Sequence, residues 1–204
     1  MTTTAAPRLT AKGERTRGKI IDAAAALIFQ DGIAGTTVET VCAAAGVGKS
    51  QIYHYFQDKA DLVRAVIESQ AEALVSAQDP HLADIHGWES WDDWRDFLVE
   101  TQRRGGCVGG CPLGSLAMEL VDCDDLTRSV LVRSFQRWEA AFVSAIRQMK
   151  GLGLIRRDAD DTVLASALLA AVQGGLLLSQ TAKSVTPLQA SLNGAIGSLR
   201  SFAV

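Results

Sequence analysis

Six large apolar residues recur at three- and four-residue steps near the middle of the chain, and this repeat constrains the fold more than any other feature. They are Leu131, Phe135, Trp138, Phe142, Ile146 and Met149. Residues at this spacing share one face of an α-helix, because the helix has about 3.6 residues per turn. Sustained alternation of β-branched residues, which is typical of half-buried strands, is scarce. The sequence therefore predicts an all-α fold.

Similar patterns, separated by glycine and proline, predict about nine helices without internal repeats. Thr36 and Glu39 have the spacing of a capping box, Gly46 can end the helix that follows, and Asp58 can cap another. Pro80 is expected to close the fourth helix. The expected helices cover about residues 14–29, 38–45, 49–56, 59–78, 91–102, 112–120, 131–149, 160–182 and 187–202.

Two short helices joined by Gly46-Val47-Gly48 predict a helix-turn-helix, since glycine permits the tight reversal between them. In the second helix, Ile52 and Phe56 lie four residues apart and can both face inward. This arrangement directs the polar side chains outward, where the second helix of such a unit enters the major groove of DNA. The outward set is Lys49, Ser50, Gln51, Tyr53 and His54.

The chemistry of the outward set suits DNA. Gln51 can pair with an adenine edge, and Lys49 can donate to guanine or to a phosphate. Tyr53 and His54 can contact the DNA backbone. The alternative, an ordinary surface helix, does not account for two aromatic residues beside a basic first turn.

Charge is unevenly distributed along the chain. Residues 1–20 carry a net charge of +4, including Arg8 and Lys12, whereas the whole chain has a formal net charge of −3. A basic arm before an acidic body fits a protein whose N-terminal end meets phosphates, although a solvated helix start is the simpler alternative. The first residues lack the apolar stretch of a secretory signal, so we expect a cytoplasmic protein.

The stretch from Phe29 to Leu62 closely resembles the DNA-binding signature of the TetR family of repressors. The matching positions are Phe29, Gly32, Thr36-Thr37-Val38, Ala45-Gly46-Val47, Tyr53, Tyr55-Phe56, Lys59 and Leu62. The later helices agree with that family in number and length only. The resemblance implies an N-terminal arm and three-helix DNA-binding domain over residues 1–60, followed by a ligand-binding and dimerisation domain over residues 61–204.

The resemblance also carries residue roles. It implies that residues 49–54 contact the major groove, that Thr36 and Thr37 contact phosphate, and that Lys59 anchors the DNA backbone. Gly48 departs from the family pattern, which often has serine there, and this change weakens a helix cap or a phosphate contact. Cys42 replaces a common alanine and is expected to be a small buried residue.

Two enzymatic interpretations have little support. Gly48-Lys49-Ser50 ends like a phosphate-binding P-loop, but position 43 is Ala43 where that loop needs glycine, and a helix precedes it. A helical thiol enzyme would need a histidine or carboxylate near its cysteine in a recognisable arrangement, which the sequence lacks. We therefore expect a regulator that is not an enzyme and that has no cofactor or metal site.

The TetR resemblance implies a C-terminal domain that binds a small molecule and then releases the DNA operator. It implies repression, which the residues themselves do not distinguish from activation. Apolar and aromatic residues suggest a hydrophobic effector, although plain core packing is the alternative for each of them. The candidate effector-binding residues are Trp94, Leu98, Cys111, Leu113, Met118, Phe135, Trp138 and Phe142.

The chain has four cysteines, Cys42, Cys107, Cys111 and Cys123, too irregularly spread for a disulfide framework, and we interpret them as reduced thiols. Cys107 and Cys111 precede a predicted helix, where the helix dipole favours the thiolate. The segment through Glu119 also resembles a TetR subgroup in which some members respond to electrophiles or oxidants. A thiol-based redox or electrophile sensor is thus the alternative to a ligand-responsive repressor.

The last two helices are expected to dimerise. Residues 162–182 carry no charge, and we interpret this run as a buried helix that does not span a membrane. Two such helices from each subunit would form a four-helix interface, and a homodimer would bind a palindromic operator in double-stranded DNA. The candidate interface residues are Leu168, Val172, Leu176, Leu188, Leu192, Ile196 and Leu199.

Overall fold

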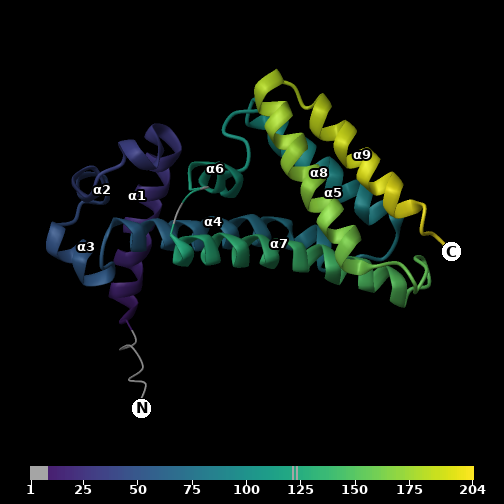
Figure 1. Ribbon diagram of the computed structural model, residues 1–204, viewed down its shortest axis with the longest axis horizontal. Coiled ribbons are helices and arrows are strands. Elements are labelled where there is room, and N and C mark those ends of the chain that lie inside the picture. Colours follow the sequence, from purple (N-terminus) through teal and green to yellow (C-terminus); the bar gives the residue numbers. More distant parts are fainter. Residues whose placement is uncertain (1–8, 121, 123) are drawn as a thin grey trace, which may run out of the picture. The chain divides into compact units, whose positions relative to one another are not determined.

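The computed structural model describes residues 9–120, 122 and 124–204, so Arg8 of the predicted basic arm and Cys123 lie outside the described residues. The described residues form nine helices and no strand, with one isolated antiparallel bridge between Ile155 and Ala203 (Figure 1). The prediction of an all-α fold is confirmed.

The chain divides into two compact units between Ser69 and Gln70, inside helix α4 (Lys59–Leu82). The boundary predicted between residues 60 and 61 falls near the start of the same helix. The position of the functional boundary stays a prediction.

The first unit contains α1 (Ala11–Gly35), α2 (Val38–Ala45), α3 (Lys49–Tyr55) and the beginning of α4. Helix α1 begins earlier than predicted because the Thr10 hydroxyl accepts a hydrogen bond from the Gly13 N–H. It also continues past the predicted end, across a kink at Gly32, whose φ of 72° is readily adopted by glycine. The core of this unit includes Ile20, Ile21, Ala24, Ile28, Val41, Ile52, Phe56, Leu62, Val63 and Val66.

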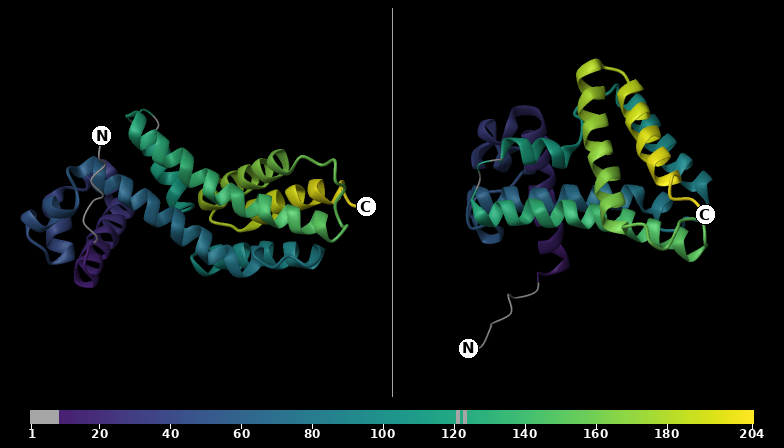
Figure 2. Two further views of the ribbon diagram at one scale, coloured as in Figure 1. Left: turned by 90° about the horizontal axis from the view of Figure 1, so that it is seen from below. Right: turned by 45° about the vertical axis from the view of Figure 1, so that its right-hand side comes forward.

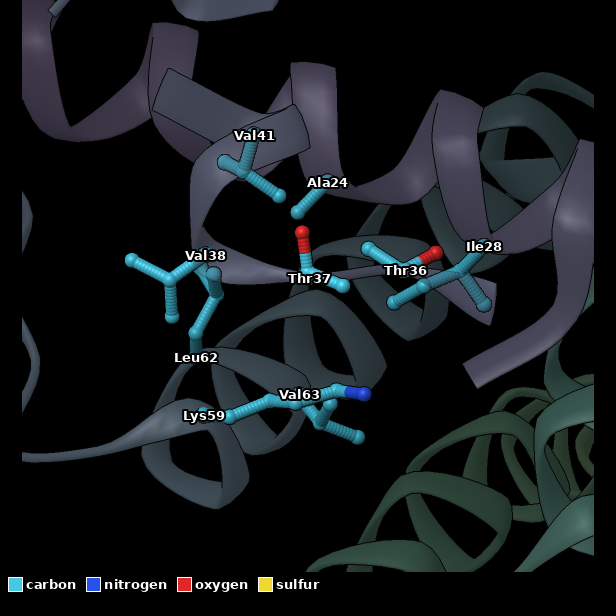
Figure 3. Close-up of a pocket in the computed structure, with 9 residues that line it drawn as sticks. All are labelled: Ala24, Ile28, Thr36, Thr37, Val38, Val41, Lys59, Leu62 and Val63. Atoms are coloured by element: carbon cyan, nitrogen blue, oxygen red, sulfur yellow. The ribbon is translucent and has the colours of Figure 1, made fainter. Parts of the chain in front are cut away.

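A small pocket lies where α1, α2 and the start of α4 meet, lined mainly by apolar side chains (Figure 3). Two polar side chains that line it donate hydrogen bonds to the kinked end of α1. The Thr36 hydroxyl donates to the Gly32 carbonyl at 2.9 Å, and the Lys59 Nζ donates to the Ile33 carbonyl at 2.5 Å. These bonds satisfy carbonyl groups that the end of a helix leaves without partners.

The second unit contains the rest of α4 and five helices. They are α5 (Trp88–Arg104), α6 (Pro112–Glu119), α7 (Asp125–Gly151), α8 (Asp161–Ala182) and α9 (Thr186–Arg200). Pro80 was predicted to close α4, but the helix continues to Leu82 with the proline in its last turns. The ends predicted for α6 and α8 agree with the structure to within one residue.

Helices α8 and α9 pack against each other, and α8 also packs against α7 (Figures 1 and 2). The α8–α9 approach is close at Gly175, where a Cβ atom would lie 2.3 Å from the Ser191 Oγ. Among the described helices, α8 has the length and apolar composition to cross a bilayer, and such a profile is also found in core helices of soluble proteins.

This packing corrects the predicted dimer interface. All seven candidate residues, from Leu168 to Leu199, are at most 5% exposed within a single chain. Their side chains fill the core between α8 and its neighbours, so they cannot form a surface for a partner. The spacing correctly placed these residues on one face of each helix, but that face is turned inward.

Candidate nucleic-acid interface

Helices α2 and α3 form the predicted helix-turn-helix. Gly46 ends α2 in the left-handed conformation with φ 65°, and its N–H bonds to carbonyls of the last turn of α2. Glycine adopts this conformation without steric cost, which explains the tight reversal after α2. Gly48 then precedes the first residue of α3, Lys49.

The cap of α2 differs from the prediction by one residue. The Thr37 hydroxyl accepts a hydrogen bond from the Thr40 N–H at 3.1 Å, and the Thr40 hydroxyl accepts one from the Thr37 N–H at 3.0 Å. The capping box therefore joins Thr37 to Thr40 and not Thr36 to Glu39. Thr36 is 3% exposed, so the expectation that it faces a phosphate is wrong, whereas Thr37 is exposed.

The start of α3 compensates for its missing cap side chain. Gly48 has no side chain to accept a bond, but the Gln51 Oε1 accepts one from the Gly48 N–H at 3.2 Å. The Gln51 side chain thus replaces half of a capping box in this structure. A bidentate bond to an adenine would require the amide to turn away from the Gly48 N–H.

Helix α3 has two distinct faces. Ile52 and Phe56 are each 2% exposed and belong to the core, as predicted. The opposite face presents the five predicted polar side chains, all of which are exposed; they are Lys49, Ser50, Gln51, Tyr53 and His54. Tyr53 is 54% exposed, so its ring and its hydroxyl are accessible to a partner.

An ion pair links the two helices. The Lys49 Nζ lies 2.5 Å from the Glu39 Oε1 in the first turn of α2, and the two side chains are 57% and 62% exposed. The hydrogen bond from Lys49 lowers the pKa of Glu39, and the Glu39 carboxylate raises the pKa of Lys49. Glu39 was expected to take part in a cap, and its pairing with Lys49 does not follow from the sequence because only the folded turn brings the two side chains together.

Other basic groups of this unit have mixed roles. Lys59 is half-buried, and its ammonium donates one hydrogen bond to the Ile33 carbonyl. A contact between its other N–H donors and the DNA backbone stays a prediction. The Arg17 guanidinium lies 5.3 Å from the centre of the Phe56 ring and packs against the end of α3. Lys12, Arg15 and Lys19 are exposed along the first turns of α1.

The predicted effector-binding residues are buried, half-buried or exposed. Trp94, Leu113, Trp138 and Phe142 are at most 1% exposed, and Cys111 is 7% exposed. Leu98 and Phe135 are half-buried, whereas Met118 is 77% exposed. Met118 thus differs from the buried candidates, and its contact with an effector stays a prediction.

A buried amide that sequence analysis missed lies among the tryptophans. The Gln78 Oε1 of α4 accepts hydrogen bonds from the indole N–H of Trp94 at 3.0 Å and from that of Trp138 at 3.4 Å. Gln78 is 2% exposed. It joins α4 to α5 and α7 through polar bonds inside an aromatic cluster, where an unmade bond is costly.

The described cysteines have different surroundings. Cys42 of α2 is half-buried, less enclosed than predicted, while Cys107 and Cys111 are buried. The Cys111 Sγ accepts hydrogen bonds from the Gly114 N–H and the Gln173 Nε2, each at 3.4 Å. A reactive thiol at either buried position stays a prediction. The described residues contain no group of three potential metal ligands.

A short, exposed polar helix after a tight glycine turn, supported by a small helical core, defines a helix-turn-helix DNA-binding protein. Comparisons with known proteins agree with this class. Residues 20–66 match the model of the bacterial regulatory proteins of the tetR family, and residues 89–195 match a tetracyclin repressor-like C-terminal domain.

Relatives and solved structures extend over most of the chain. An uncharacterized HTH-type transcriptional regulator in the lacX 3'region of Lactococcus lactis is 25% identical, covering 87% of this chain and 90% of the relative. The HTH-type transcriptional repressor DhaR of Mycobacterium sp. (strain GP1) is 26% identical, covering 84% and 86%. The crystal structure of a regulatory protein TetR from Rhodobacter sphaeroides superimposes with a TM-score of 0.76 at 23% identity, covering 93% and 99%.

The chain belongs to the TetR family of transcriptional regulators. It is a DNA-binding transcriptional regulator, with its helix-turn-helix in the N-terminal unit and a helical C-terminal domain.

Proposed function

We propose that this protein is a repressor that binds a palindromic operator as a homodimer and is released by a small apolar effector. The observation that carries this proposal is the two-faced helix α3, whose polar side is exposed while Ile52 anchors the other side in the core. A rigidly held helix with outward donors is suited to major-groove contacts. The name of one relative, a transcriptional repressor, supports repression.

Individual contacts follow from the chemistry of the exposed side chains. We assign Lys49 to a guanine edge or a phosphate, and Gln51 to an adenine edge once it leaves the Gly48 N–H. Tyr53 and His54 are assigned to the DNA backbone, together with Thr37 at the start of α2. The exposed basic residues of α1 add contacts that do not depend on base sequence.

The exposed sides of α8 and α9 support a homodimer. Val163, Leu177 and Leu178 are 63%, 63% and 57% exposed on a helix that carries no charge beyond its first residue. Exposed apolar side chains on one long helix favour association with a partner. Gly174 of α8 and Gly194 of α9 have open space around them, so a second copy can approach closely. The two-fold symmetry of such a dimer would be matched by the operator.

The aromatic cluster around Gln78 supports an effector site in the second unit. Trp94, Trp138 and Phe142 supply apolar surface, and Gln78 supplies a polar group that can exchange partners. The buried indole N–H of Trp91 has no hydrogen-bond partner among the described residues. An apolar effector with a hydrogen-bond acceptor would satisfy it.

The DNA affinity of two double variants tests the proposal. The Lys49→Ala/Gln51→Ala variant should lose roughly 100-fold or more in operator affinity, since each base contact contributes about 1–3 kcal/mol. The Arg128→Ala/Gln136→Ala variant removes one positive charge and one amide from the exposed surface of α7 and should bind normally. Fluorescence anisotropy measures both, and circular dichroism confirms folding. Unchanged operator affinity and specificity in the first variant would refute the site.

A further inference from the structure

An acidic residue stands within the surface that the proposed function assigns to DNA. Glu39 lies in the first turn of α2, and its carboxylate is 2.5 Å from the ammonium of Lys49, the first residue of α3. Both side chains are more than half exposed. The pair therefore lies on the same open side of the helix-turn-helix as the groove-facing residues.

Both partners are charged, and additional contacts hold the carboxylate in place. The hydrogen bond from Lys49 lowers the pKa of Glu39, with additional contributions from its own backbone N–H and from Thr37. Thr37 in turn caps α2 through the Thr40 N–H. The carboxylate is thus an ionised group fixed to the start of α2, while Lys49 is the group that can turn away.

A stabilising role in folding does not explain this pair. Exposed ion pairs contribute little to stability, because water and salt screen both charges. Near DNA the same two charges matter more. A lysine paired with a carboxylate is not free to displace a counterion from a phosphate, and the carboxylate itself is repelled by the polyanion.

We propose that Glu39 is a specificity-determining residue that withholds Lys49 from phosphates and, with Lys49, matches the edge of one G·C base pair. In the major groove, guanine presents two acceptors beside the amino donor of cytosine. An ammonium beside a carboxylate is the complementary arrangement. On other sequences the base edge does not replace the bond between Lys49 and Glu39. Glu39 therefore weakens binding to wrong DNA more than it weakens binding to the operator.

This inference rests on the proposed function and predicts a gain of binding to the wrong DNA. The Glu39→Gln variant should bind random-sequence duplex about 3- to 10-fold more tightly at 0.1 M salt. The slope of log affinity against log salt should steepen by about 1.8, the value of two additional phosphate contacts, one from each subunit of the dimer. A G·C to A·T change at the contacted pair should cost Glu39→Gln less than it costs the wild type.

Matched variants isolate the role of the pair. Glu68→Gln makes the same chemical change at an exposed site on α4 and should leave both measurements unchanged. In a Lys49→Met background, Glu39→Gln should have a much smaller effect on non-specific binding, because the withheld ammonium is gone. Melting temperatures of all variants, measured by circular dichroism, should agree within the error of the measurement.

Three results would overturn the inference. The first is unchanged non-specific affinity and salt slope in Glu39→Gln; the second is an equal gain in the Lys49→Met background, which would indicate general repulsion. The third is an equal gain in Glu68→Gln. Failure of the wild type to bind any duplex would instead refute the proposed function, so the two failures are distinguishable.

Discussion

Helices α3 and α8 differ in how clearly their sequences indicate which side of the helix is exposed. Helix α3 is short and strongly two-sided, with Ile52 2% exposed and its neighbour Tyr53 54% exposed. Helix α8 is apolar on both sides, with Leu176 5% exposed and its neighbour Leu177 63% exposed. In a sequence, only polar side chains indicate which side of a helix is exposed. The exposed side of α3 was therefore predicted correctly, whereas the exposed side of α8 was not.

The difference also separates two kinds of function. The exposed side of α3 offers donors and acceptors, which suit the polar edges of base pairs. The exposed side of α8 offers apolar side chains and small residues, which suit a second protein helix. Substitutions at neighbouring positions can therefore separate folding from binding in each helix.

The largest effect is expected at the buried side of α3. Ile52→Ala should lower the free energy of unfolding by roughly 2–5 kcal/mol, because it removes a fully buried side chain and leaves a cavity. Tyr53→Ala should change stability by less than about 0.5 kcal/mol and weaken DNA binding instead. Urea denaturation and anisotropy titrations measure the two effects. Equal losses of stability would contradict the two-sided description of α3.

On α8 the exposed side should control assembly. Leu177→Glu should raise the dimer dissociation constant at least about 100-fold, equivalent to about 2.7 kcal/mol, since a charge would be buried against an apolar partner. Leu152→Glu, at a site that is 54% exposed beyond the end of α7, is the control and should leave the dimer intact. Sedimentation equilibrium measures both. A Leu177→Glu protein that remains fully dimeric would refute this interface.

The smallest effect concerns a second lysine–carboxylate pair. The Lys150 Nζ lies 2.5 Å from the Asp161 Oδ1, and both side chains are less than 20% exposed, unlike Lys49 and Glu39. Lys150 lowers the pKa of Asp161 below its ordinary value of 3.8. Stability from this pair is therefore present above pH 3.8 and lost as the pH falls through the lower pKa of the folded state.

Accordingly, Asp161→Asn should reduce the stability at pH 7 by about 1 kcal/mol or less. The difference from the wild type should disappear in acid, and DNA binding should not change. Urea denaturation at a series of pH values measures this. A constant difference down to the lowest pH would show that the carboxylate charge is not the cause. Glu39→Gln should give the reverse pattern, with altered DNA binding and unaltered folding.

The positions of the helices could largely be predicted from the sequence, because apolar spacing, caps and glycines depend on neighbouring residues. Gly46 ends α2, and the Asp58 Oδ1 accepts a hydrogen bond from the Asp61 N–H near the start of α4, both as predicted. The exposed side chains of α3 could also be predicted, since Ile52 and Phe56 are the apolar residues that fill the core. These features depend on a few neighbouring residues.

Features that depend on distant contacts were missed. Thr36 and Thr37 are both plausible caps, and the kink at Gly32 decides between them by drawing the Thr36 hydroxyl to a carbonyl of α1. Gln78 looks like a surface residue until α5 and α7 bring two indoles to it. On α8, spacing identifies one face but does not say whether α9 or a second subunit covers it.

The central claim is that α3 presents Lys49 to His54 to base pairs, and selection from a random pool of DNA duplexes tests it most directly. The wild-type protein should enrich a two-fold symmetric sequence, with affinity that falls steeply as salt rises. Recovery of no common sequence, or binding indifferent to both sequence and salt, would contradict the claim.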